Sequence, residues 1–139
     1  MYQRNVDALL AAWNEGDLEG LDAFFDAKTI RRAPASANSD ADSLTELKQV
    51  ITNFRTSFPD CKVTIDEIFF QDDRSFALWT FEGTNTGPGD FPTTGKAVKF
   101  SGASFARYKD GKGTEELVYF DTMDMMVQLG LLELPSVDG

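Results

Sequence analysis

Residues 98–121 read VKFSGASFARYKDGKGTEELVYFD, and this stretch decides the fold class. Its centre holds Asp110-Gly111, a residue pair that favours the two-residue turn of a β-hairpin. The turn separates two segments rich in apolar and aromatic residues, which are predicted to be strands over residues 98–108 and 115–121. Strands joined by so short a turn pair in the antiparallel sense.

The second of these strands ends in a carboxylate, Asp121. Because side chains alternate between the two faces of a strand, Leu117, Tyr119 and Asp121 are predicted to share one face with Glu115. A carboxyl group beside a leucine and a tyrosine is expected to be desolvated, which raises its pKa and suits a proton-transfer residue. The alternative is that Asp121 caps the helix predicted to follow it, since Asp is a preferred N-cap.

Upstream of residue 98 the sequence predicts two further strands, over residues 63–70 and 76–84, on either side of a turn. Residues 85–95 contain three glycines and two prolines and are predicted to form a loop. Gly83 and Gly102 lie inside predicted strands, where glycine is typical of a bend or a bulge.

Helical patterns precede the strands. Apolar residues recur at the spacing of an amphipathic helix over residues 6–13, and Gly16 is placed to end that helix. Residues 18–25 are predicted to form a second, short helix, and a capping-box motif at residues 43–46 begins a third that extends to residue 58. A short strand is expected over residues 29–33.

Helices followed by hairpin-linked strands indicate one α+β domain over residues 1–139. The short connections predict an antiparallel sheet. A strongly curved sheet wrapped by about three N-terminal helices would form a cone with an open mouth. Seventeen aromatic residues (twelve Phe, three Tyr and two Trp) can fill its core or line an apolar pocket.

The composition excludes several classes of function. A net charge of −10 argues against nucleic acid and anionic membranes as partners, because both require clustered Lys and Arg. The chain contains no histidine, which excludes Ser-His and Cys-His nucleophilic sites and histidine-rich metal sites. The single cysteine, Cys61, is interpreted as structural. Neither a signal-peptide pattern nor a membrane-spanning apolar stretch is present, so a cytoplasmic protein is expected.

Several short motifs, in their order and spacing, resemble the SnoaL-like polyketide cyclase family of the cystatin-like cone superfamily, over about residues 6–132. The motifs are Ala12-Trp13-Asn14-Glu15-Gly16-Asp17, Phe58-Pro59-Asp60, Gly83-Thr84-Asn85-Thr86-Gly87, Pro92-Thr93-Thr94-Gly95-Lys96, Asp110-Gly111-Lys112 with Glu115 and Asp121, and Gln128-Leu129-Gly130. The resemblance implies that Asp121 is the general acid/base of an intramolecular aldol ring closure. It also implies an aromatic polyketide ester as substrate and no metal or cofactor.

Three positions depart from the family pattern. Asn85 stands where the family usually has His, Leu117 where it often has Trp, and Arg32 where it often has His. Asn85 can hydrogen-bond an enolate oxygen but cannot carry a proton, so the losses of histidine weigh against a true cyclase.

Further residues are candidates for substrate binding. Tyr119 is expected either to orient a substrate oxygen or to pack its ring with its hydroxyl at the mouth of the cone. Trp13 is expected to line the pocket or to pack in the core, and Trp79 and Leu117 are candidates for the wall of the pocket. Arg107 is expected to bind an anionic group or to pair with Glu115 across the hairpin.

Two functions follow from these residues. One is a cofactor-independent enzyme in which Asp121 abstracts a proton next to a carbonyl and Asn85 or Tyr119 hydrogen-bonds the enolate oxygen. The other is a non-catalytic module that binds a small hydrophobic ligand. A third hypothesis is a dimeric interaction protein whose interface is the outer face of the sheet, and a homodimer is compatible with either of the first two functions as well.

Overall fold

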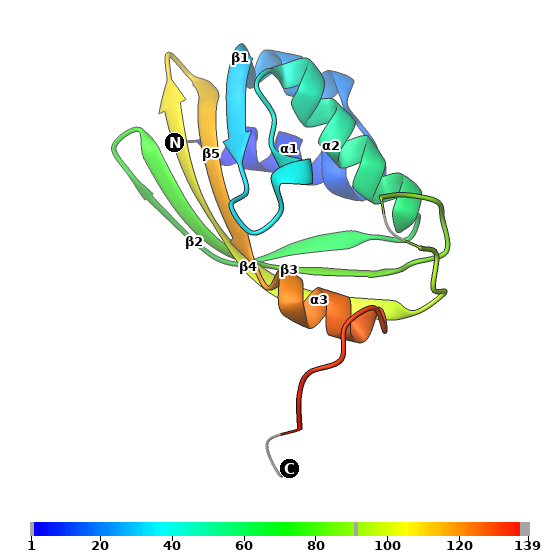
Figure 1. Cartoon of the computed structure of the whole chain (residues 1–139). Coiled ribbons are helices and arrows are strands. Elements are labelled where there is room, and N and C mark those ends of the chain that lie inside the picture. Colours follow the sequence, from blue (N-terminus) through cyan, green and yellow to red (C-terminus); the bar gives the residue numbers. More distant parts are fainter. Residues whose placement is uncertain (1, 91, 137–139) are drawn as a thin grey trace.

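The structure is a computed structural model that describes residues 2–90 and 92–136. Two helices, a five-stranded sheet and a short C-terminal helix make up the fold (Figure 1). The elements in chain order are α1 (Gln3–Glu15), η1 (Glu19–Ala23), β1 (Phe25–Arg32), η2 (Ala37–Ser39), α2 (Leu44–Ser57), β2 (Lys62–Gln71), β3 (Arg74–Thr84), β4 (Ala97–Lys109), β5 (Lys112–Phe120) and α3 (Thr122–Gln128). The predicted α+β class is confirmed.

The strands follow the order β1-β5-β4-β3-β2 in one sheet, which bends round α1 and α2 on its concave side (Figure 1). The pairs β2–β3, β3–β4 and β4–β5 are antiparallel, as their short connections predict. The edge strand β1 differs, because it runs parallel to β5. The sheet is therefore mixed. The argument from short connections does not apply to β1, which is far from β5 in the chain.

The turns and caps read from the sequence are present. Asp110 and Gly111 both have positive φ, 53° and 82°, in the turn between β4 and β5. Gly16 ends α1 in the left-handed conformation, and Ser43 accepts a hydrogen bond from the Glu46 backbone N–H at the start of α2. The short second helix is a 3₁₀-helix, Glu19–Ala23.

Gly83 and Gly102 do not mark bulges. The β3–β4 register is unbroken from Arg74–Arg107 to Thr84–Ala97. Gly102 is instead required by a close approach, because a Cβ there would lie 2.3 Å from the indole ring of Trp79 on the neighbouring strand.

Aromatic side chains form a large part of the core between the helices and the sheet. Phe81 and Phe100 stack with their ring centroids 5.0 Å apart, and Phe58 meets Phe81 edge-on at 5.4 Å. Trp79 and Phe120 extend this cluster towards β5. Within the described residues, no helix is long and apolar enough to cross a membrane.

Candidate functional site

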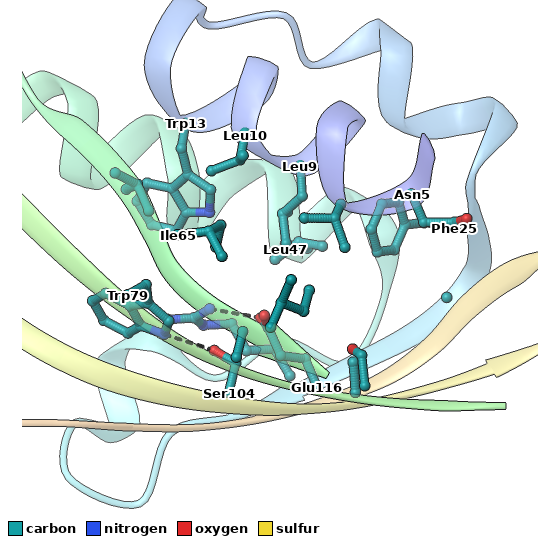
Figure 2. A pocket seen from close by; sticks show the side chains of 18 of the residues that line it. Asn5, Leu9, Leu10, Trp13, Phe25, Leu47, Ile65, Trp79, Ser104 and Glu116 are labelled. Carbon is teal, nitrogen blue, oxygen red and sulfur yellow. Dashed lines mark hydrogen bonds and ion pairs between the residues drawn. The ribbon is translucent and has the colours of Figure 1, made fainter. Parts of the chain in front are cut away.

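A cavity of about 100 Å³ lies between α1 and the concave face of the sheet (Figure 2). Figure 2 shows Leu9, Leu10 and Trp13 of α1 pointing into it from above and Trp79 lying across the sheet below. Most of the lining is apolar; it includes Val6, Phe25, Ile30, Leu47, Phe54, Val63, Ile65, Ile68, Ala77, Phe81, Phe100, Ala106 and Phe120. The cavity is therefore suited to a small hydrophobic molecule.

Small side chains on the inner face of the sheet leave this space open. Ala77 of β3 lies opposite Ser104 of β4, and Ala106 of β4 lies opposite Glu116 of β5. The cavity sits beside these residues and inside the layer of aromatic side chains that forms the core. An occupant would thus contact the core directly.

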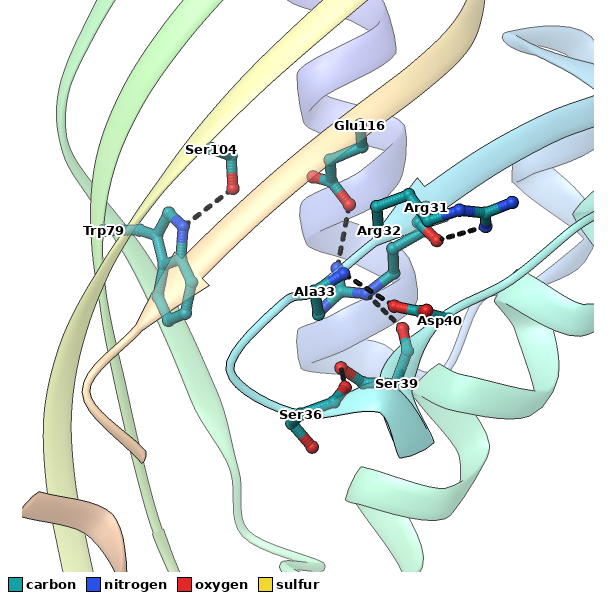
Figure 3. Close-up of polar contacts among 9 residues, drawn as sticks. All are labelled: Arg31, Arg32, Ala33, Ser36, Ser39, Asp40, Trp79, Ser104 and Glu116. Carbon is teal, nitrogen blue, oxygen red and sulfur yellow. Dashed lines mark hydrogen bonds and ion pairs between the residues drawn. The ribbon is translucent and has the colours of Figure 1, made fainter. Parts of the chain in front are cut away.

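A buried ion pair forms the polar part of the cavity wall. Arg31 of β1 and Glu116 of β5 are partners in the parallel register, and Arg31 Nη1 donates to Glu116 Oε1 at 2.8 Å (Figure 3). Their side chains are only 7% and 18% exposed. Arg31 Nε donates to the Ser39 carbonyl oxygen at 2.8 Å, and the guanidinium carbon lies 5.8 Å from the ring centroid of Trp13. These contacts hold the arginine in one position.

Glu116 has one oxygen left for a ligand. Its Oε1 accepts from Arg31, whereas Oε2 has no hydrogen-bond or ion-pair partner among the residues that the structure describes. The paired guanidinium offsets part of the cost of keeping a charged carboxylate in an apolar site. This arrangement can hold a carboxylate ready to accept a proton or a hydrogen bond from a bound molecule.

Other side chains of the cavity wall form hydrogen bonds with one another. Trp79 Nε1 donates to Ser104 Oγ at 2.9 Å, and Ser75 Oγ and the Tyr108 hydroxyl share a hydrogen bond of 2.9 Å. Burial raises the pKa of the Tyr108 hydroxyl above its ordinary value, so this group is neutral over the physiological range.

Of the residues predicted to bind substrate, the structure brings Trp13 and Trp79 to the cavity. Trp13 contributes to its roof from α1, and Trp79 to its floor from β3 (Figure 2). Both also pack in or against the core, so for Trp13 the lining of the pocket and the packing of the core, which were the two alternatives, occur together.

Asp121 lies elsewhere. It is exposed at the N-cap of α3, where its Oδ1 accepts from the Asp124 backbone N–H at 2.9 Å, and it does not line the cavity. The capping interpretation describes this geometry, and the expected desolvation is absent. A catalytic role for Asp121 stays a prediction, carried now by the family resemblance alone.

Tyr119, Leu117 and Arg107 lie on the opposite, outer face of the sheet. Tyr119 is 54% exposed, and Leu117 pairs with Phe105 across β4 and β5. Arg107 forms an ion pair with Glu115 at 3.7 Å, which is the alternative that the hairpin register favours. None of the three lines the cavity, so their predicted contacts with substrate have no support from this arrangement.

Asn85 is buried and binds its own loop. Its Nδ2 donates to the Pro92 carbonyl oxygen at 3.1 Å and to Thr94 Oγ1 at 3.3 Å, and its backbone pairs with Lys96 and Gly95. It does not line the cavity. The side chain therefore holds the loop after β3, and a contact with an enolate oxygen stays a prediction.

Arg31, Glu116 and Ser104 were missed as site residues. A signal for Glu116 is present in the sequence, because period-two alternation puts it on the same face as Val118 and Phe120, both of which are buried. Arg31 has no comparable signal in the sequence. It stands next to a second arginine, Arg32, and the sequence does not show which of the two pairs with Asp42 at the surface. Within the described part of the chain, no group of three or more His, Cys, Asp or Glu side chains is arranged to hold a metal ion.

Comparison with known proteins adds a family and a fold. A family model described as SnoaL-like polyketide cyclase matches residues 3–129. TsrD from Streptomyces laurentii superimposes with a TM-score of 0.83 at 24% identity, covering 94% of this chain and 95% of its own. IdmH from Streptomyces antibioticus, described as a candidate polyketide cyclase, gives 0.79 at 23% identity, with 94% and 99% covered.

A protein from Catenulispora acidiphila with a ketosteroid isomerase-like fold, in complex with trimethylamine, gives a TM-score of 0.78 at 17% identity, with 94% and 97% covered. At these identities the structural likenesses show the fold. A search of curated proteins finds no match to this chain.

Proposed function

The chain belongs to the SnoaL-like polyketide cyclase family, and from that membership and the cavity we propose that it is a cofactor-independent enzyme acting on a small hydrophobic carbonyl compound. The reaction is the transfer of a proton at the carbon next to the carbonyl, in a ring closure or an isomerisation. The observation that carries the proposal is the Glu116 carboxylate in the wall of an apolar cavity, with Oε1 bound by Arg31 and Oε2 without a partner among the described residues. Glu116 is the candidate base by position.

The chemistry needs no further reactant. Glu116 Oε2 takes the proton, and the electron pair of the broken C–H bond moves into the enolate. In a ring closure the enolate carbon attacks a second carbonyl of the same molecule, and the new alkoxide oxygen takes the proton back from Glu116. In an isomerisation the proton returns to another carbon. Arg31 holds the carboxylate in place through the 2.8 Å contact with Oε1.

Deuterium exchange tests this proposal without the natural substrate. 2-Tetralone, a bicyclic ketone with an acidic C–H, is incubated in deuterium oxide with the protein, and loss of the proton signal is followed by NMR. We expect exchange faster than in buffer alone, and a loss of about 100-fold or more in Glu116→Gln, the typical contribution of a general base. Glu116→Asp retains the charge facing Arg31 and serves if the Gln variant fails to fold.

Asp121→Asn is the matched comparison, because the family resemblance implies Asp121 as the base. Asn caps a helix about as well as Asp, so this variant retains the fold. Unchanged exchange in Asp121→Asn with loss in Glu116→Gln assigns the base to Glu116, and the reverse assigns it to Asp121. Exchange no faster than in buffer would remove the enzyme proposal and leave a binding module, the alternative that the absence of histidine favours.

A homodimer is the second part of the proposal. The outer face of the sheet carries an apolar row, Phe69–Phe76–Phe105–Leu117, in which Phe69 and Phe76 are 58% and 43% exposed. Contiguous apolar surface of this kind is typical of an interface.

We infer a second copy as the occupant. On one side of the row lie Arg74 and the ion pair of Arg107 with Glu115, and on the other side lies Glu67, so a two-fold rotation about an axis along the row brings Arg74 of one copy towards Glu67 of the other. Sedimentation should give a dimer for the wild type and a monomer for Phe76→Lys. A monomeric wild type at high concentration excludes this interface.

A further inference from the structure

The Ser104 hydroxyl donates no hydrogen bond to any residue that the structure describes. Ser104 Oγ accepts the hydrogen bond from Trp79 Nε1, at 2.9 Å. This is the side-chain hydrogen bond that Ser104 forms with residues 2–90 and 92–136, and the residue lines the cavity. The indole N–H occupies a lone pair of Oγ, so the hydroxyl proton remains available to a ligand.

The position of this hydroxyl is set by its neighbours. The Trp79 ring lies across Gly102, where any Cβ would collide with it, and it meets the rings of Phe100 and Phe120. The indole therefore has a fixed place on the cavity floor, and its N–H fixes one side of the Ser104 hydroxyl (Figure 3). A donor held in this way loses little conformational freedom on binding a ligand.

Ser104 and Glu116 face the same space from neighbouring strands. Ser104 pairs with Val118 in the β4–β5 register, and Glu116 precedes Val118 by two residues, so it lies on the same face. Diagonal neighbours of this kind have Cα atoms about 7–8 Å apart, with the side chains closer still. A ligand atom that accepts from Ser104 therefore lies only a few bonds from an atom that contacts Glu116 Oε2.

We propose that Ser104 donates a hydrogen bond to the carbonyl oxygen of the ligand while the acidic carbon next to that carbonyl faces Glu116. This inference rests on the proposed function. Glu116 contacts the acidic carbon of an enolisable ketone, and Ser104 adds the contact with its carbonyl oxygen. It gives the ligand class a defined shape, that of a compact apolar ring system with a single carbonyl at one edge. The same hydrogen bond strengthens as negative charge develops on the oxygen in the enolate.

The test compares 2-tetralone with tetralin, a hydrocarbon of the same ring system that lacks the carbonyl. Dissociation constants are measured for both compounds by isothermal titration calorimetry. A change in the shape of the cavity affects both compounds alike, so the ratio of the two constants reports the contact with the carbonyl. In Ser104→Ala the preference for 2-tetralone over tetralin should fall about tenfold, the ratio that corresponds to a hydrogen bond of about 1.4 kcal/mol. Tetralin should bind as it does to the wild type.

Two further variants make the result specific. Ser101→Ala removes a hydroxyl from the same strand but from its exposed outer face, and it should leave the preference unchanged. Ser104→Thr restores the hydroxyl and should restore the preference, which separates a lost donor from a disturbed Trp79. Circular dichroism confirms that each variant is folded.

The outcomes separate this inference from the proposed function. If Ser104→Ala keeps the wild-type preference while the wild type catalyses exchange, the inference is overturned and the proposed function stands. A Ser104-dependent preference without exchange supports the inference and rejects catalysis. A wild type that binds neither compound, or binds both equally, overturns the inference as well.

Discussion

Replacing Arg31 by Met should destabilise the protein more than any single change at an exposed ion pair. The variant leaves the Glu116 carboxylate facing an apolar cavity without its partner, and it removes the hydrogen bond from Arg31 Nε to Ser39. Breaking a buried pair in this way costs about 3–5 kcal/mol. Because the Glu116 side chain is 18% exposed, we expect a loss at the lower end of this range, about 3 kcal/mol including the lost hydrogen bond.

Urea unfolding followed by circular dichroism at pH 7 measures this loss. A change of about 3 kcal/mol corresponds to a fall in Tm of about 10 °C for a chain of this size. Lys99→Met is the matched control, because its ion pair with Glu82 is exposed, and it should cost less than about 1 kcal/mol.

A double-mutant cycle tests the physical cause. In Arg31→Met/Glu116→Gln the unpaired carboxylate is gone, so the double variant should be more stable than the sum of the single losses predicts, by at least about 1 kcal/mol. Losses that add to within about 0.5 kcal/mol would show that the two side chains do not depend on each other, and the role given to Arg31 would be rejected.

Gly102→Ala should lower the free energy of unfolding by about 1–3 kcal/mol, because the new Cβ forces Trp79 out of place. Urea unfolding measures the loss of stability, and the fluorescence of Trp79 reports the displacement of its ring. An unfolding midpoint equal to that of the wild type would contradict this prediction. Hydrogen bonds from the Thr84 backbone N–H and hydroxyl lower the pKa of Asp60, so its stabilisation is complete above the ordinary value of about 3.9 and is lost as the pH falls through the folded-state value. The difference in Tm between the wild type and Asp60→Asn should therefore shrink as the pH falls from 7 to 3. A difference that stays constant would contradict the stabilising role of the Asp60 carboxylate. Burial raises the pKa of Tyr108, so the wild type should lose stability relative to Tyr108→Phe as the pH rises above about 10. If the difference between their urea unfolding midpoints stays the same from pH 8 to 11, this prediction is wrong.

Local signals in the sequence predicted most of the fold. The Asp110-Gly111 turn, the Gly16 C-cap and the Ser43 capping box each act within a few residues, and each is present. The parallel pairing of β1 with β5 could not be read in this way. It joins segments about 85 residues apart, such as Arg31 and Glu116, and depends on how the whole sheet closes.

The candidate site was harder to predict because alternation along a strand defines two faces without saying which one is inside. Both faces of this sheet carry aromatic residues, Phe100 and Phe120 on the concave side and Phe76 and Phe105 on the convex side. Leu117 and Tyr119 lie on the convex face, and Asp121, which alternation predicts to share a face with them, is exposed at the start of α3. Tertiary packing decides which face of the sheet α1 covers, and this packing depends on residues far apart in the chain.

The position of the cavity inside the aromatic core has a consequence for finding its ligand. A molecule that fills this space becomes part of the packing that holds the folded state together, so its binding energy adds to the free energy of unfolding. At a concentration 100 times its Kd, a ligand that binds only the folded chain raises that free energy by about 2.7 kcal/mol. Screening ketones by the rise in melting temperature would therefore rank them by affinity before any reaction is known.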